Sequence, residues 1–161
     1  MSAAMQTALI GIMAGGLIAA LAYATWTDIR SRIIPNPLNA GIALSAPLWW
    51  WASGLSPWPG MAIQIALGGA ALLVFMGAFA MGAMGGGDVK LIAALGLWLM
   101  PLDFLRMIVW MSLGGGLLTF GMLIWKWARK NEGQLEIPYG VAIAAATAPV
   151  LAERYIYHFP G

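Results

Sequence analysis

The sequence predicts an all-α membrane protein, a polytopic bundle of transmembrane helices. Of its 161 residues, 61% are hydrophobic and only 9% are charged, whereas a soluble domain carries about 25% charged residues. The apolar residues also fall in long blocks, close to the roughly 20 residues that a bilayer-spanning helix needs. These blocks do not alternate between apolar and polar residues, as the strands of a membrane barrel would.

Six transmembrane segments are predicted, in one integral-membrane domain over residues 1–161 with no soluble domain. They cover about residues 7–26, 37–52, 59–81, 89–100, 104–127 and 138–157, so the fourth is short. Asn36 and Pro37 mark the start of the second segment, as N-cap and first helical residue. The glycines at 68–69 and 114–116 predict close helix packing. The tryptophans at 49–51 and 58 predict an interfacial aromatic belt.

Basic residues predict the orientation of the bundle. With six spans, six of the eight Lys and Arg residues fall on one side, which the positive-inside rule assigns to the cytoplasm. These six are Arg30, Arg32, Lys90, Lys126, Arg129 and Lys130. Both termini then face the opposite side, and Asp28 and Asp88 both lie at the cytoplasmic end. The net charge of +2 is read as a topology signal, with no nucleic-acid partner expected.

The composition also restricts the chemistry. The chain has no cysteine, which excludes disulfides, cysteine zinc sites and a thiol nucleophile. Its single histidine, His158, argues against a histidine-rich metal site. We therefore expect neither a metal nor a cofactor.

Four of the six acidic residues have a structural explanation. Glu132 and Glu136 lie in the polar loop before the last helix. Asp103 is placed to cap the fifth helix, and Glu153 to pair with Arg154 or Arg106.

Asp28 and Asp88 are different, because each adjoins a long apolar helix and a short loop. Ionisable groups at the membrane boundary are costly unless they are paired or functional. Taken singly, Asp28 is explained as an interfacial charge that pairs with Arg30 or Arg32, and Asp88 as the N-cap of the fourth helix. Taken together on one side of the membrane, the two favour a function. Two nearby carboxylates that share a proton can hydrolyse a peptide bond without a metal.

The three glycines before Asp88 support this interpretation. Gly85, Gly86 and Gly87 allow close backbone approach or positive φ. Irregular backbone at membrane depth implies a water-accessible pocket. We expect this backbone to pair with an extended substrate by strand addition; a flexible hinge is the alternative.

Three ordered motifs resemble the type IV prepilin peptidase family. Residues 85–91, GGGDVKL, resemble its G-x-G-D-x-K hallmark, and residues 28–36, DIRSRIIPN, resemble its signature of an Asp followed by Ile-Pro-Asn. Residues 137–144, IPYGVAIA, resemble a third block that opens the last helix. The resemblance spans residues 28–144, most of the chain.

The resemblance implies an inner-membrane aspartic protease that removes the short basic leader of prepilins at the cytoplasmic face. Asp28 and Asp88 would be the catalytic pair. The supporting residues would be Gly85, Gly86, Gly87, Lys90, Pro35, Asn36, Pro138, Tyr139 and Gly140. For Lys90, an anchor at the membrane interface is favoured over a role in catalysis. The expected partners are a prepilin, with its leader and apolar helix, and membrane lipid.

Departures from the family narrow the prediction. Larger relatives carry paired cysteines for zinc and also methylate the new N-terminus, and the lack of cysteine here argues against methylation. The short form resembles the minimal peptidases of tight-adherence (Flp) pili more than archaeal preflagellin peptidases. Two other classes stay open from the residues alone: a transporter or proton-conducting subunit that uses Asp28 and Asp88, and an assembly factor without chemistry.

Overall fold

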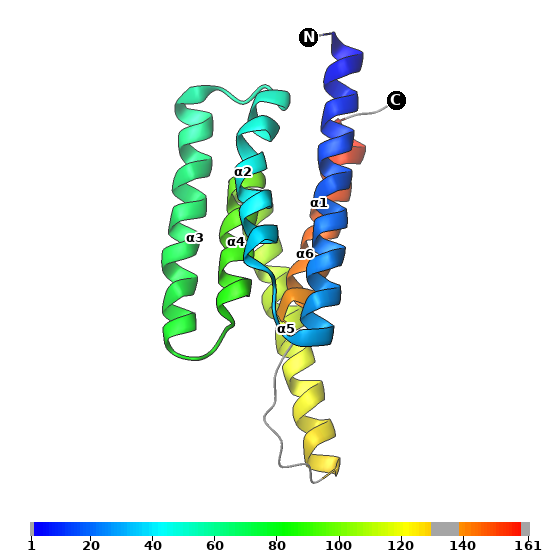
Figure 1. The fold of residues 1–161 in the computed structure, drawn as a ribbon, viewed down its shortest axis with the longest axis vertical. Coiled ribbons are helices and arrows are strands. Elements are labelled where there is room, and N and C mark those ends of the chain that lie inside the picture. The colour runs from blue at the N-terminus through cyan, green and yellow to red at the C-terminus, as the bar shows by residue number, and fades with distance from the viewer. Residues whose placement is uncertain (1, 130–138, 159–161) are drawn as a thin grey trace.

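The protein is an elongated bundle of helices (Figure 1). The computed structural model describes residues 2–129 and 139–158. All regular structure in this part of the chain is helical, which confirms the predicted all-α class. The elements are α1 (Ala3–Ser31), α2 (Asn36–Ala52), η1 (Pro57–Met61), α3 (Ala62–Ala80), α4 (Gly86–Trp98), α5 (Pro101–Arg129) and α6 (Tyr139–His158). The predicted site residue Pro138 lies outside the described residues, as do Lys130, Glu132 and Glu136.

Three stretches are long and apolar enough to cross a membrane. They are Ala3–Ser31, Pro57–Ala80 and Pro101–Trp125. Helices α2 and α4 are shorter, at 17 and 13 residues. Large apolar side chains face outward on several helices, among them Ile12 and Leu73, each 73% exposed. A surface of this kind suits lipid, so the chain is a multi-pass membrane bundle.

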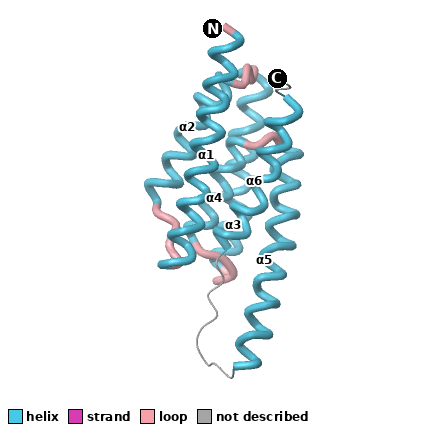
Figure 2. The backbone as a smooth tube through the Cα atoms, turned by 90° about the vertical axis from the view of Figure 1, so that its right-hand side faces the viewer, coloured by secondary structure: helices cyan, strands magenta, loops and turns pink. Residues whose placement is uncertain are grey.

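The short helix α4 is the centre of the bundle. It packs on α2 and α3 and also contacts α5 and α6, while α1 packs on α2 and α6. Leu91, Ile92 and Leu95 on α4 have no exposed surface. Figure 2 shows that α5 extends beyond one end of this bundle. The central place of α4 puts its first turn, with Asp88, inside the protein.

The C-terminal end of α4 is capped by side chains from two other helices. The last carbonyls of a helix have no intrahelical partner, and the membrane interior offers no water to bond them. The carbonyls of residues 97–99 accept hydrogen bonds from the indoles of Trp50 (2.6 Å) and Trp49 (3.1 Å) and from the Gln64 amide (2.9 Å). These three bonds allow α4 to end inside the bundle.

The predicted aromatic belt is therefore wrong for two of its members. Trp49 and Trp50 are buried, and their indoles bond α4. Trp51 and Trp58 are exposed, by 58% and 81%. Helical periodicity separates the adjacent tryptophans, since Trp49 and Trp50 face the core and Trp51 faces outward.

Close packing at glycine occurs between α3 and α4. A Cβ on Gly96 would lie 3.1 Å from the Cα of Gly68, so the two helices meet there backbone to backbone. The same expectation does not hold for Gly69, Gly114 and Gly116, since a Cβ on any of them would meet nothing within 4 Å.

Several predicted helix ends shift by a few residues. Helix α1 continues to Ser31, so Asp28 lies in its last turn and not in the loop after it. Pro35, not Asn36, is the N-cap of α2. Gly86 and Gly87 are already helical, because α4 begins at Gly86.

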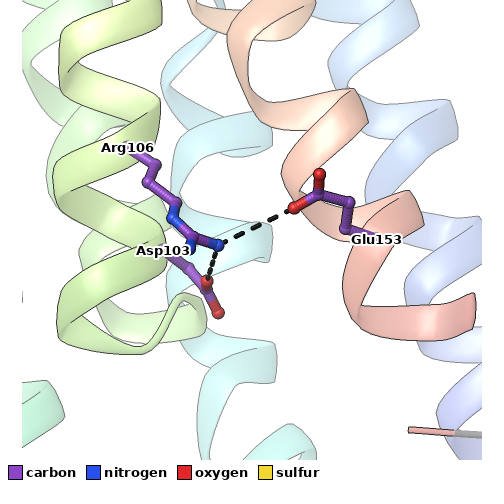
Figure 3. A network of polar contacts seen from close by, with 3 residues as sticks. All are labelled: Asp103, Arg106 and Glu153. Carbon is purple, nitrogen blue, oxygen red and sulfur yellow. Dashed lines mark ion pairs between the residues drawn. The ribbon is translucent and has the colours of Figure 1, made fainter. Parts of the chain in front are cut away.

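The remaining described acidic side chains lie at the opposite end of the bundle, where α5 begins and α6 ends. Arg106 lies 3.9 Å from Asp103 and 3.7 Å from Glu153 (Figure 3). The predicted pairing of Glu153 with Arg106 is thus present, whereas the Arg154 side chain lies outside the described ones. Arg106 and Glu153 are more than half exposed, so these ion pairs add about 0–1 kcal/mol.

Candidate active site

Asp28 and Asp88 converge at one end of the bundle. Asp28 is in the last turn of α1 and Asp88 in the first turn of α4, and these two turns lie at the same end of the molecule (Figure 1). Their exposed fractions are only 5% and 8%. The two charges are close enough to interact electrostatically. Two buried carboxylates from distant parts of the sequence thus share one region.

Asp28 is held by the start of α6. The backbone N–H of Gly140 donates a 2.9 Å hydrogen bond to its Oδ2, and the Val141 amide faces the same carboxylate. Gly140 has to be glycine here, because a Cβ would lie 2.9 Å from Oδ2 and 3.1 Å from the Asp28 Cβ. Of the two arginines predicted to pair with Asp28, Arg32 attracts its carboxylate electrostatically. The guanidinium of Arg30 instead lies 5.5 Å from the centre of the Trp26 ring.

Asp88 does not cap α4 in the way predicted. Gly85 is the N-cap, and Asp88 lies three residues further on. Its carboxylate reaches back to the Gly85 backbone, as the acidic residue of a capping box does. A Cβ on Gly85 would lie 2.8 Å from Oδ2 of Asp88, so a larger residue there would displace this oxygen.

The other oxygen of Asp88 has no hydrogen-bond partner. Oδ1 is buried and unpartnered among the described residues. A buried polar atom without a partner costs about 1–3 kcal/mol. Such an atom calls for a functional explanation, and a carboxylate oxygen with free lone pairs can bond a water molecule or a substrate group.

The glycine run serves close approach, and not positive φ. Gly85 is extended, with φ −72° and ψ 145°, and Gly86 and Gly87 are helical. A Cβ on Gly87 would lie 3.0–3.3 Å from the Cβ, O and N of Ile34. The first turn of α4 therefore packs directly on the backbone of the segment before α2.

Asn39 contacts the predicted site residue Gly87, although no motif in the sequence singles it out. It is 4% exposed, and its Nδ2 donates a 3.0 Å hydrogen bond to the carbonyl of Gly87. Pro35 supports it in turn, since the Asn39 N–H lies 3.3 Å from the Pro35 carbonyl. The available signal was an isolated asparagine within an apolar segment, three residues after Asn36.

Lys90 contacts the first residue of α2 and not an aspartate. Its Nζ donates a 2.8 Å hydrogen bond to Oδ1 of Asn36, and both side chains are exposed. Lys90 thus joins α4 to α2 at the end of the bundle, and its role as an anchor at the membrane interface stays a prediction.

A cavity of about 490 Å³ is bordered by the chain neighbours of the two glycines that contact the aspartates, although neither aspartate lines it. Tyr139, next to Gly140, lines it. The Tyr139 ring lies against Gly115, since a Cβ on that glycine would be 3.2 Å from the ring. Met84, next to Gly85, lines the cavity as well. Its other walls are mainly apolar side chains of α5. Met84 and Tyr139, which are next to the glycines that contact the two aspartates, therefore border the same largely apolar cavity.

The fold and site define a class of protein: a helical membrane bundle with two buried aspartates and, among the described residues, no cluster of three metal-ligating side chains. Comparison with family profiles matches residues 15–120 to the type IV leader peptidase family. This match covers more than half of the chain, so the chain belongs to the type IV leader peptidase family. Comparison with curated proteins and with solved structures gave no match.

Proposed function

We propose that this protein is a prepilin leader peptidase with Asp28 and Asp88 as its catalytic pair. It hydrolyses the peptide bond after the short basic leader of type IV prepilins. The observation that carries this proposal is the convergence of two buried carboxylates, one with an unpartnered oxygen, in a chain of this family.

In the proposed mechanism, one carboxylate is ionised and takes a proton from a water molecule. The protonated partner polarises the scissile carbonyl, whose carbon the water attacks. The tetrahedral intermediate then breaks its C–N bond, and the amine leaves with a proton from the carboxyl group that received one. The two groups act as a unit, so neither proton is assigned to one aspartate alone.

The surroundings of the pair suit this chemistry. The 2.9 Å bond from Gly140 orients the Asp28 carboxylate. The unpartnered Oδ1 of Asp88 is the atom we assign to bonding the water or the scissile carbonyl. Since two of the three glycines are helical, substrate pairing with this backbone is limited to Gly85 and the residues before it.

The cavity beside Tyr139 is assigned to the first apolar side chains after the cleavage point. It is bordered by neighbours of both aspartate contacts and is mainly apolar. Its volume of about 490 Å³ suits a few side chains and not a whole helix. The apolar helix of the substrate would continue along the lipid-facing surface.

The protein is proposed to lie in the bacterial inner membrane with this site at the cytoplasmic face. The support is the gathering of Arg30, Arg32 and Lys90 at the same end as the aspartates. A Flp-type prepilin is the proposed substrate, since the Ile-Pro-Tyr-Gly block at residues 137–140 resembles that of the minimal Flp-type peptidases.

The test is co-expression with Flp-type and other candidate prepilins, with leader removal followed by mass. Asp28→Asn and Asp88→Asn should each lower cleavage by about 10²- to 10⁴-fold, the usual contribution of general acid–base catalysis. Asparagine keeps the side-chain shape, so both variants should still insert. Asp103→Asn is the matched control, because Asp103 lies in the first turn of α5, at the other end of the bundle from the two aspartates. Normal processing by either site variant would refute the assignment of Asp28 and Asp88 as the catalytic pair.

A further inference from the structure

A second cavity, of about 560 Å³, opens between α2, α3 and α4, with α4 as its floor. It is lined mainly by small apolar residues: Ala40, Ala43, Gly68, Gly69, Ala93 and Ala94. Ile65 at its edge is 58% exposed. The cavity is therefore a shallow groove in a surface that faces lipid.

One end of this groove is polar. Asn36, Asn39 and Lys90 line it, and Lys90 is exposed. The ammonium of Lys90 bonds Oδ1 of Asn36 at 2.8 Å, and no described carboxylate forms an ion pair with it. The Oδ1 of Asn39, a side chain that is 4% exposed, is buried without a hydrogen-bond partner in the described structure. A positive charge and free hydrogen-bond donors thus meet at the end of this apolar groove.

We propose that this groove binds one anionic phospholipid. The phosphate lies at Lys90, whose ammonium has two donors beyond the one used by Asn36, and at the Asn36 amide, whose Nδ2 is left to donate. Phosphatidylglycerol, an anionic lipid of the charge that Lys90 attracts, is the lipid to use as probe. One acyl chain lies along the small residues that follow.

The dimensions favour an acyl chain over a helix. Lys90 and Leu97 mark the two ends of the groove on α4, which are about 10 Å apart at 1.5 Å per residue. A docked helix would need a longer seam, and the basic leader of a substrate would be repelled by Lys90. The lipid site is separate from the aspartates, although Asn39 lies in its wall and also bonds Gly87.

Lipid retention by the purified, detergent-solubilised protein tests the proposal without any need for cleavage. Native mass spectrometry would compare phosphatidylglycerol with neutral phosphatidylcholine. We expect one phosphatidylglycerol per chain. Lys90→Ala should lower its affinity by about fivefold, since a basic residue near lipid contributes about 1 kcal/mol. Gly69→Leu should lower it as well, because a side chain there enters the groove without meeting any atom within 4 Å at its Cβ.

Two matched controls locate the effect. Arg30→Ala removes an exposed charge at the same end of the bundle but outside the groove. Gly121→Leu adds the same apolar volume on α5, where a Cβ also meets nothing within 4 Å. Neither control should change retention. The proposal is overturned if Arg30→Ala weakens retention as much as Lys90→Ala, if Gly69→Leu retains the lipid fully, or if inorganic phosphate alone displaces it.

Discussion

Gly140 is the point where α6 touches the proposed catalytic pair, and Gly140→Ala tests that contact. An alanine Cβ would lie 2.9 Å from Oδ2 and 3.1 Å from Cβ and Cγ of Asp28, which is too close for either side to remain in place. The Gly140 hydrogen bond to the carboxylate, 2.9 Å long, would be stretched or lost. Hydrogen bonds to charged groups contribute about 1.5–3 kcal/mol. If the contact orients Asp28 for catalysis, kcat/KM should fall by about 10- to 150-fold.

The assay is cleavage of a purified prepilin by the variant in detergent or liposomes. Thermal unfolding of the same sample measures the cost of overpacking, which is about 1–3 kcal/mol. Gly16→Ala is the control, because it makes the same change in α1 where a Cβ meets nothing within 4 Å. Cleavage by Gly140→Ala at the wild-type rate, or an equal loss of activity in Gly16→Ala, would show that this contact does not orient Asp28 for catalysis.

Three further changes test the fold around the site. Gly87→Ala should lower the free energy of unfolding by about 1–3 kcal/mol, because its Cβ meets backbone at 3.2–3.3 Å, whereas Gly86→Ala meets only a ring at 3.4 Å and should be tolerated. Trp50→Phe removes the 2.6 Å donor of the Leu97 carbonyl, which keeps a 3.4 Å bond from the Gln64 amide, and should cost about 0.5–1.5 kcal/mol, while exposed Trp51→Phe should cost little; equal melting temperatures would contradict this. Arg106→Ala should change stability by less than about 1 kcal/mol and leave cleavage intact, and a large loss of cleavage would link that end of the bundle to the site.

Much of this protein is predictable from local sequence. Long apolar blocks predict a helical membrane bundle, because each span must satisfy its backbone hydrogen bonds internally. Short motifs around Asp28 and Asp88 indicate the family, and the family match agrees. The helix ends are less predictable: α1 runs past its apolar block to Ser31, since interfacial polar residues can continue a helix.

The contacts between helices could not be predicted in this way. The tryptophans at 49 and 50 have the composition of an aromatic belt, yet they bond the end of α4, which only the packing of α2 against α4 brings within reach. Asn39 belongs to no motif, and its structural role is its hydrogen bond to the carbonyl of Gly87, which only the folded structure shows.

The sequence by itself determined the class of this protein, the number of its apolar segments and the two aspartates worth testing, because hydropathy and motif spacing are local properties of the chain. The tertiary structure decided that Gly140 meets Asp28 and that one oxygen of Asp88 has no partner among the described residues. These features depend on how α1, α4 and α6 pack, and packing joins residues that no local pattern connects.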